Sequence, residues 1–246
     1  MNLEISFVSL SLGSFVEVKF EKAVNRIAES ASRCSRDSAQ IRLMAVSKFH
    51  PAEKIARLAD LGQTYFGENY AQELEEKSNK LAKLPITWSF IGQLQSNKIK
   101  KIVFHADEIQ SIAKLKDAKL IERYVCEKES NQFPVFICVN AANESQKRGA
   151  SMREARDLAK EIEDQCPHLL LRGIMAIPPP LSTLQISPKG GIPYLYSELR
   201  ELADCVGQGK LSLGMSQDLE AAIAAGSDIV RLGTALFGER PVKKTD

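Results

Sequence analysis

One lysine in this 246-residue sequence occupies a position where its amine could react with a carbonyl group. Lys48 follows the apolar residues Leu43–Val46 in LMAVSKFHP, and Pro51 prevents that run from continuing as an ordinary strand. Because burial disfavours a charged lysine, we expect Lys48 to have a depressed pKa and to act as a nucleophile. It is therefore a candidate for Schiff-base formation, the alternative being a lysine that reaches solvent or pairs with a carboxylate.

Two glycine-containing turns near the end of the chain have the composition of a phosphate site. They lie in LSLGMSQD (Leu211–Asp218) and in IVRLGTALFGER (Ile229–Arg240). Glycine lets the backbone approach an anion closely, hydroxyl groups donate hydrogen bonds, and unpaired N–H groups at helix starts favour negative charge. The alternative for Ser216 is that it only caps a following helix, 217–225. The residues expected to hold the anion are Gly214, Ser216, Gly233 and Thr234.

The elements that must position these residues alternate between β-branched apolar runs and segments of helical periodicity. This alternation is typical of parallel strands with crossover helices, and eight strands close a (β/α)8 barrel. Loops after the strands build the site at one rim, so Lys48 and both turns should meet there. A doubly wound open sheet is the alternative fold. The predicted strands are Ile41–Val46, Tyr65–Phe66, Thr87–Ile91, Glu108–Ser111, Val135–Val139, Leu170–Ile177, Leu211–Leu213 and Ile229–Leu232.

Helices are predicted between these strands, and an additional helix precedes the first strand. The additional helix is expected over Val18–Cys34, after a loose N-terminal extension, 1–15, and the whole chain, 1–246, is read as one domain. Later helices are predicted at Met152–Asp164, Tyr194–Cys205 and Gln217–Ala225. The segment Pro178–Pro193 is too rich in proline and glycine for an ordinary connection, and is either a lid over the rim or a surface insertion.

Composition narrows the classes of partner. With 33 basic and 31 acidic residues interspersed, the net charge of +2 offers no footprint for nucleic acid, so a small molecule is the expected partner. The mildly apolar N-terminus is too short to cross a bilayer. The five cysteines form no C-x-x-C pair, which predicts free thiols in a reducing compartment and no metal site. The protein is expected to be cytoplasmic and monomeric.

Several sequence strings resemble one family closely. They are AVSK, YFGENYAQE, WSFIGQLQSNK, GIMAIPPP and LSLGMSQDLEAAIAAGSDIVRLGTALFGER, in order from Ala45 to Arg240. These strings are similar to the YggS/PROSC family of pyridoxal phosphate homeostasis proteins. The resemblance implies a fold-type III barrel like that of alanine racemase, with pyridoxal 5′-phosphate as the cofactor and a role as its carrier or buffer. Pyridoxal phosphate-dependent apoenzymes are the implied recipients.

The resemblance also implies roles for individual residues. Lys48 corresponds to the lysine that forms the Schiff base, and Arg231 to the arginine that faces the pyridine nitrogen in alanine racemase. Asn69 and Met175 match residues of the same rim, although a helix cap and barrel filling are their ordinary alternatives. The residues implied to hold the phosphate are Ser216, Gly233 and Thr234.

Two further positions need comment. Lys147 matches a lysine near the cofactor entrance of the family and is read as a second contact, or else as a solvated charge. Ser89 stands where the family has a histidine in W-H-F-I-G, so no role of that imidazole transfers to this chain.

Carrier and enzyme remain alternatives, and we expect the carrier, with no catalytic residue. A guanidinium at Arg231 would leave the pyridine nitrogen unprotonated, which weakens carbanion stabilisation but not binding. Racemisation also needs a second base from an additional domain, and the chain ends at Asp246, soon after the eighth strand. An amino-acid racemase or a related lyase is the leading alternative, and a Schiff-base aldolase is a more distant one.

Overall fold

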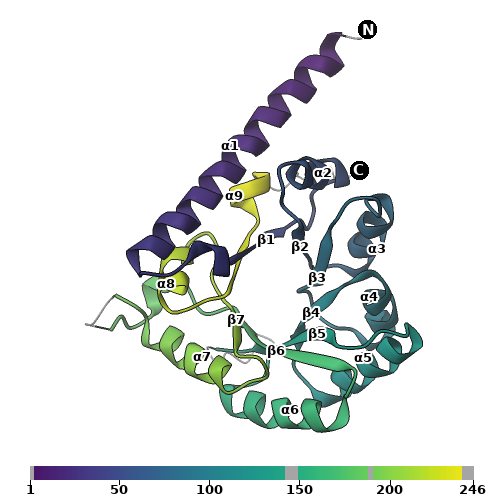
Figure 1. The fold of residues 1–246 in the computed structure, drawn as a ribbon, viewed down its shortest axis with the longest axis vertical. Coiled ribbons are helices and arrows are strands. Elements are labelled where there is room, and N and C mark those ends of the chain that lie inside the picture. The colour runs from purple at the N-terminus through teal and green to yellow at the C-terminus, as the bar shows by residue number, and fades with distance from the viewer. Residues whose placement is uncertain (1–2, 142–148, 188–190, 240–246) are drawn as a thin grey trace.

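The computed structural model describes residues 3–141, 149–187 and 191–239, with the side chains of the first helix from Phe15 onward. Eight parallel strands of this part close into a barrel in sequence order, which confirms the predicted (β/α)8 architecture (Figure 1). The strands are β1 (Arg42–Val46), β2 (Tyr65–Glu68), β3 (Thr87–Phe90), β4 (Glu108–Ile112), β5 (Phe133–Val139), β6 (Leu169–Ala176), β7 (Lys210–Ser212) and β8 (Ile229–Leu232).

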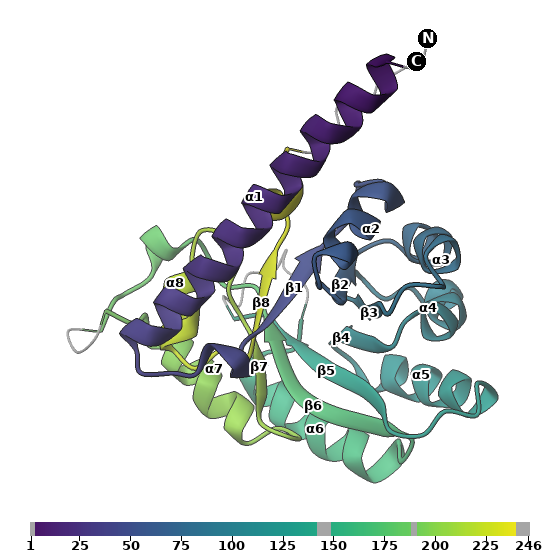
Figure 2. The same ribbon diagram turned by 45° about the horizontal axis from the view of Figure 1, so that its top comes forward.

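Helices surround the strands, as the two views of the ribbon show (Figures 1 and 2). Each of the longer ones turns an apolar face to the barrel, such as Ile55 and Leu58 of α2. The α-helices are α1 (Leu3–Arg33), α2 (Ala52–Asp60), α3 (Ala71–Lys80), α4 (Ile99–His105), α5 (Leu115–Glu127), α6 (Met152–Gln165), α7 (Tyr194–Asp204), α8 (Leu219–Ala224) and α9 (Thr234–Phe237). Short 3-10 helices are η1 (Ser38–Gln40), η2 (Ser96–Lys98) and η3 (Leu181–Thr183).

The apolar core has two parts. The larger part fills the layer between the strands and the helices. The smaller part lies inside the barrel, where Met44, Tyr65, Phe136, Met175 and Ile229 pack together. Close packing of large side chains there makes the barrel interior a filled core rather than a pore.

Helix α1 begins earlier than expected. We predicted its start at Val18, and that boundary is wrong because the helix already begins at Leu3. Its buried residues Val16, Ala23, Ile27 and Ala31 form a stripe at helical spacing that packs beside α8 and α9. Whether 1–15 is a loose extension stays a prediction, since side chains are described only from Phe15.

The segment Pro178–Pro193 contains some regular structure of its own. Residues Leu181–Thr183 form η3, Ile186 pairs antiparallel with Pro193, and the Ser187 N–H donates to the Ile192 carbonyl at 2.9 Å. Residues 188–190 lie outside the described residues. Its role as a lid or as a surface insertion stays a prediction.

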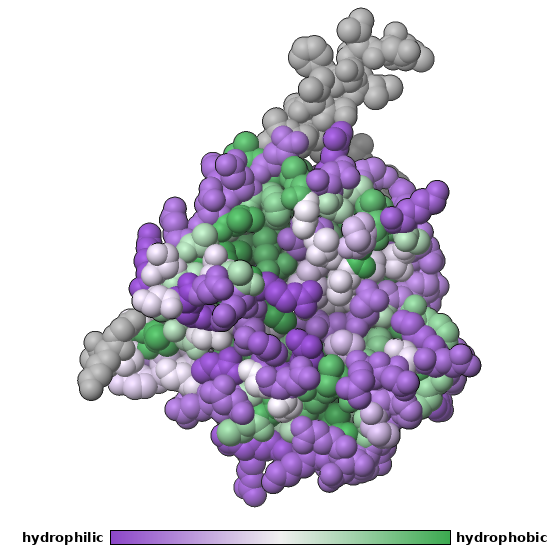
Figure 3. Space-filling model, viewed as in Figure 1, coloured by the Kyte–Doolittle hydropathy of each residue, from purple (hydrophilic) through white to green (hydrophobic). Residues whose placement is uncertain are grey.

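The outer surface is mixed in character. Hydrophilic residues cover most of the face seen in Figure 3, and a hydrophobic area lies beside α1. Across the described part of the chain, the helices lack the combination of length and apolarity that crossing a membrane requires.

Candidate functional site

Lys48 lies in a tight turn between β1 and α2. The Ser47 N–H still bonds to the Gly67 carbonyl of β2 at 3.0 Å, and the His50 N–H closes the turn on the Ser47 carbonyl at 3.0 Å. Between them Phe49 has a positive φ of 67°, a conformation that costs energy in a bulky residue. The turn ends at Pro51, which precedes α2. The half-buried Lys48 is thus carried on constrained backbone at the carboxyl end of the first strand.

A buried charged cluster behind this turn, the Lys77 cluster, consists of Ser47, Glu68, Glu73 and Lys77. The Lys77 ammonium donates to Glu68 Oε1 at 2.6 Å, to Glu73 Oε2 at 2.7 Å and to the Ser47 carbonyl at 2.9 Å. The Ser47 hydroxyl donates to Glu68 at 2.7 Å, and the Phe49 N–H donates to Glu73 at 2.8 Å. Both neighbours of Lys48 are therefore anchored to the same cluster.

The cluster is more deeply buried than a surface ion pair. The side chains of Lys77 and Glu68 are 7% and 0% exposed. Burial raises the pKa of Glu68, and the adjacent ammonium of Lys77 opposes that rise. A buried carboxylate is stable as an ion only when it is paired with a cation and hydrogen-bonded. The charged states of Glu68, Glu73 and Lys77 therefore depend on one another.

The Lys48 side chain lines a cavity of about 320 Å³ at the rim of the barrel, here called the Lys48 cavity. This volume is sufficient for a small cofactor. All seven residues predicted to bind the cofactor line it, so the fold brings the entire predicted set together. The lining comprises Lys48, Asn69, Met175, Ser216, Arg231, Gly233 and Thr234, joined by Val46, His50, Ile91, Ile177, Met215 and Gln217.

Asn69 presents an oxygen without a partner. Its Oδ1 atom is buried and accepts no hydrogen bond from any described residue. The alternative of a helix cap is wrong, because Tyr70 occupies the cap position of α3 and no side chain caps that helix. Gly92 fixes the backbone here, since a Cβ on Gly92 would lie 1.9 Å from the Asn69 carbonyl oxygen. A buried acceptor left unpaired costs free energy, which indicates a ligand donor at this position.

Arg231 is held rigidly at the inner wall of the cavity. Its Nη1 donates to the Ser212 carbonyl at 2.6 Å and to the Ser212 hydroxyl at 2.9 Å, and its Nη2 donates to the Ala176 carbonyl at 2.8 Å. Burial lowers the pKa of Arg231, and the carboxylate of Asp218 opposes the shift. The guanidinium is thus a fixed hydrogen-bond donor whose Nε takes part in none of these three bonds.

The two predicted phosphate turns face the same cavity. Gly214 has a φ of +101°, and a Cβ there would meet Ala222 at 2.6 Å, so the turn after β7 requires glycine. Helix α8 begins at Leu219, later than predicted, and Asp218 rather than Ser216 occupies its cap position. The alternative role of Ser216 as a cap is therefore wrong. Its half-buried hydroxyl lines the Lys48 cavity, and the exposed Thr234 lies at its mouth.

Ser89 lies inside the barrel. It is fully buried and donates to Glu108 Oε1 at 2.8 Å, which also accepts from Gln110 Nε2 at 2.8 Å and from the Tyr65 hydroxyl. Gln110 Oε1 in turn accepts from the Ser212 hydroxyl at 2.8 Å. A continuous hydrogen-bonded chain therefore links Ser89 to the residue that holds Arg231.

A larger cavity of about 890 Å³ adjoins the first and shares Ile91, Met175 and Ile177 with it. Lys114 and Lys116 reach its wall, as does Cys138, whose pKa burial raises to about 11. We place the candidate site in the smaller cavity, because of these two cavities it is the smaller one whose described lining brings together an amine, a fixed guanidinium and hydroxyl donors.

Sequence reasoning missed several residues near Lys48. His50, which stacks on Phe237 with ring centroids 4.8 Å apart, lines the cavity and follows directly in the SKFHP string. The Lys77 cluster was also missed, although FGENYAQE contains two of its carboxylates. Lys147 lies outside the described residues, so its predicted contact is not placed.

Known proteins resemble this chain in sequence and in structure. The family model for the alanine racemase N-terminal domain matches residues 23–241. A pyridoxal phosphate homeostasis protein of Pasteurella multocida is 37% identical over 235 residues, covering 93% of this chain and 99% of that protein. One of Escherichia coli strain K12 is 39% identical over 228 residues, covering 89% and 94%.

Among solved structures, PipY of Synechococcus elongatus PCC7942 with PLP bound superposes with a TM-score of 0.70 and 32% identity. The match covers 86% of this chain and 100% of that one.

Proposed function

The chain belongs to the alanine racemase N-terminal domain family and, within it, to the pyridoxal phosphate homeostasis proteins, and from this premise we propose that it binds and carries pyridoxal 5′-phosphate. The observation that carries the proposal is the convergence of all seven predicted residues on one cavity. A PLP-bound relative of 32% identity supports it.

The Lys48 cavity fits this cofactor in volume and in chemistry. It offers an amine for the aldehyde, hydroxyl and backbone donors for the phosphate, and the unpaired buried Oδ1 of Asn69, which can accept a hydrogen bond. When bound, pyridoxal phosphate supplies an aldehyde that condenses reversibly with amines and a ring that withdraws electrons. We propose a Schiff base on Lys48, which keeps the cofactor covalently attached yet releasable by hydrolysis.

The remaining residues are proposed to orient the cofactor. Ser216, Gly233 and Thr234 follow the neighbouring strands β7 and β8, where barrels bind phosphate groups. Met175 is almost fully buried and supplies an apolar wall against which a ring can pack. Arg231 is proposed to donate a hydrogen bond to the pyridine nitrogen. The donor would be Nε or Nη2, because both Nη1 hydrogens are already donated to Ser212.

A carrier is favoured by the relatives of this chain, which are pyridoxal phosphate homeostasis proteins, whereas Arg231 alone does not exclude catalysis, because alanine racemase has the corresponding arginine. A guanidinium donates hydrogen bonds, stays protonated and cannot hold a proton on the ring nitrogen as a carboxylate does. Its hydrogen bonds to Ser212 and Ala176 also hold the guanidinium in one place. We propose a monomeric cytoplasmic carrier that passes its cofactor to pyridoxal phosphate-dependent apoenzymes. Five free cysteines support a reducing compartment.

The proposal is tested by the absorption spectrum of the purified protein before and after borohydride reduction, with the modified peptide mapped. We expect yellow protein, loss of the visible band on reduction and a pyridoxyl group on Lys48. Lys48→Ala should abolish this labelling. Lys114→Ala, which removes an exposed amine at the adjacent cavity, should leave it unchanged. Protein that stays colourless with added cofactor, or label on Lys114 instead, would contradict the proposal.

Carrier and enzyme are separated by turnover. The loaded protein is incubated with a panel of L-amino acids, and D-isomers and keto acids are measured. We expect neither product. Steady formation of either one that disappears in Lys48→Ala would make the chain an enzyme.

A further inference from the structure

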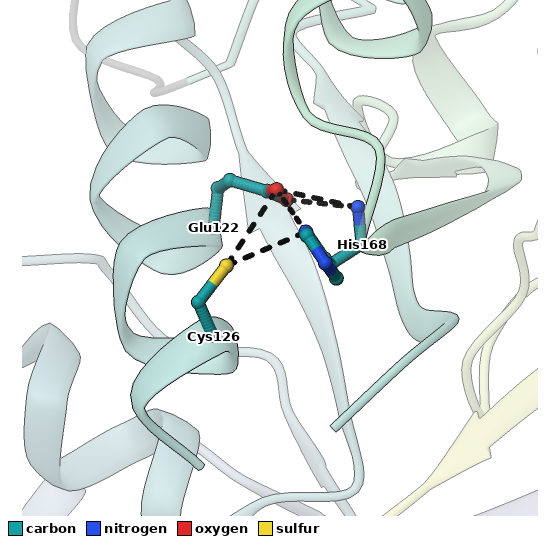
Figure 4. Close-up of side chains that lie close together, drawn as sticks. All are labelled: Glu122, Cys126 and His168. Carbon is teal, nitrogen blue, oxygen red and sulfur yellow. Dashed lines mark hydrogen bonds and ion pairs between the residues drawn. The ribbon is translucent and has the colours of Figure 1, made fainter. Parts of the chain in front are cut away.

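Three side chains with metal-binding chemistry meet on the opposite side of the barrel from Lys48. Glu122 and Cys126 lie one turn apart on α5 (Leu115–Glu127), and His168 directly precedes β6 (Leu169–Ala176). Figure 4 shows the three side chains pointing toward one another from these two elements. Thiolate, imidazole and carboxylate are the protein ligands that zinc takes.

The distances between the three donor atoms are close to those of a tetrahedral site. Cys126 Sγ lies 3.4 Å from His168 Nδ1, Nδ1 lies 2.6 Å from Glu122 Oε1, and Sγ lies 3.9 Å from the same oxygen. Zinc bonds of about 2.0 to 2.3 Å at tetrahedral angles separate such ligands by roughly 3.3 to 3.6 Å. Each pair therefore needs a change of less than about 1 Å, in which the metal replaces the hydrogen bond between Glu122 and His168.

The backbone holds His168 in place for this role. Its N–H donates to the Glu122 carboxylate at 3.2 Å, and its carbonyl accepts from the Phe133 N–H of β5 at 2.8 Å. These bonds give Glu122 and His168 a structural role, which is to stabilise the turn before β6. That role does not need a thiol beside the two side chains. Cys126 is exposed and the His168 side chain is 40% exposed, so a cation can enter and water can complete its coordination.

We propose that Glu122, Cys126 and His168 bind one zinc ion that ties α5 to the start of β6. The expectation of no metal site rested on spacing along the chain, and 42 residues separate Cys126 from His168. The site is independent of the Lys48 cavity, because β6 runs roughly 20 Å from His168 to the rim where Met175 lies. It is a second binding site, for a borderline divalent cation, and does not rest on the proposed cofactor.

The first test is equilibrium dialysis of tag-free protein against zinc chloride, with bound metal counted per chain. We expect one zinc, and at least about tenfold weaker binding in both Cys126→Ser and His168→Ala. Cys205→Ser, which removes another exposed thiol, is the matched control and should bind normally. Lys48→Ala should also bind normally, which excludes a cation held by pyridoxal phosphate.

The second test identifies the ligands by cobalt substitution. Co²⁺ added to the protein should give a thiolate-to-metal absorption band in the difference spectrum, absent from Cys126→Ser and present in Cys205→Ser. Glu122→Gln keeps an oxygen for the His168 N–H, so it should keep its far-UV circular dichroism while binding less zinc. Absence of stoichiometric zinc, undiminished binding in Cys126→Ser, or loss of binding in Cys205→Ser would each overturn the proposal.

Discussion

At the scale of single residues, the position of Lys48 depends on groups that never reach the cavity. Ser47 belongs to the Lys77 cluster and Phe49 is bonded to it, so the direction in which Lys48 leaves the backbone depends on three ionisable side chains, of which Lys77 and Glu68 are buried and Glu73 is partly buried. Burying a charge costs free energy, so such a cluster is stable only while its charged groups are paired and hydrogen-bonded with one another. We interpret the cluster as the support that orients Lys48.

Lys77→Met tests this support. The change keeps most of the aliphatic stem but leaves Glu68 without its cation, so we expect the free energy of unfolding to fall by about 3 to 5 kcal/mol. Adding Glu68→Gln should recover part of the loss, because the unpaired charge is then removed. Urea unfolding measures both effects, and pyridoxyl labelling of Lys48 should be slower in Lys77→Met even under conditions where the variant is folded.

Lys80→Met is the matched control on the same helix. Lys80 pairs with Glu53 at the surface, where both side chains are more than half exposed. Its replacement should leave unfolding and labelling close to those of the parent chain. Equal losses in Lys77→Met and Lys80→Met would show that the Lys77 cluster has no special role.

The residues of the cavity could be predicted from sequence, whereas their support could not. Lys48, Gly233 and Thr234 stand in short strings at strand ends, where residue type and position already indicate chemistry. Glu73 and Lys77, four residues apart on a helix, look like an ordinary surface ion pair. Only the packing of α3 against the turn after β1 shows that Lys77 is buried, that Glu73 is partly buried, and that the two are bonded to Ser47 and Phe49.

At the scale of elements, α1 is attached to the barrel by an ion pair as well as by apolar packing. Arg26 donates two hydrogen bonds to Glu220 of α8, from Nε at 2.6 Å and from Nη2 at 2.7 Å. The hydrogen bond from Arg26 lowers the pKa of Glu220. Both side chains are more than a third exposed, so solvent screens the interaction and its contribution to stability is small.

Glu220→Gln should therefore lower the free energy of unfolding at pH 7 by less than about 1 kcal/mol. Because the folded pKa of Glu220 lies below its unfolded value, the stabilisation is present above about pH 4.5 and is lost as pH falls through the folded pKa. Paired urea titrations at neutral and acidic pH measure the difference between parent and variant. A difference that persists after Glu220 is protonated would contradict this account.

Glu29→Gln is the control for this prediction, since Glu29 is an exposed acid of α1, the helix that carries Arg26, and lies 3.9 Å from Arg33. It should show no comparable dependence on pH.

Strand positions were predictable, and helix ends were less so. All eight predicted strands are present, because a buried parallel strand appears in sequence as a compact apolar run. The start of α1 was misplaced, since polar and apolar residues before Val18 gave no clear signal for a boundary. The start of α8 was misplaced because Ser216 is a good cap by type, while Asp218 takes that position and accepts from the Met215 N–H at 2.7 Å.

At the scale of the whole molecule, the proposed cofactor would bridge the strands where the barrel closes on itself. Lys48 follows β1, Ser216 follows β7, and Gly233 and Thr234 follow β8. The strand β7 has three residues and shares one registered pair, Ser212 with Ile229, with β8. By contrast, β5 and β6 share seven pairs, with one register shift between Val135 and Phe136. Strands β8 and β1 share four registered pairs, so the weak part is the β7–β8 junction, here called the seam, and this junction has the most to gain from a ligand.

Cofactor binding should therefore protect the seam more than the rest of the barrel. A ligand that binds only the folded state stabilises it, and local opening is suppressed most where the ligand joins elements that otherwise separate easily. Hydrogen exchange of loaded and cofactor-free protein should show the largest slowing in residues 210–218 and 229–237, with little change in β5 and β6. Lys48→Ala incubated with the same cofactor should lose most of this protection. Equal slowing around the whole barrel would indicate general stabilisation instead, and slowing confined to β5 and β6 would place the cofactor away from the seam.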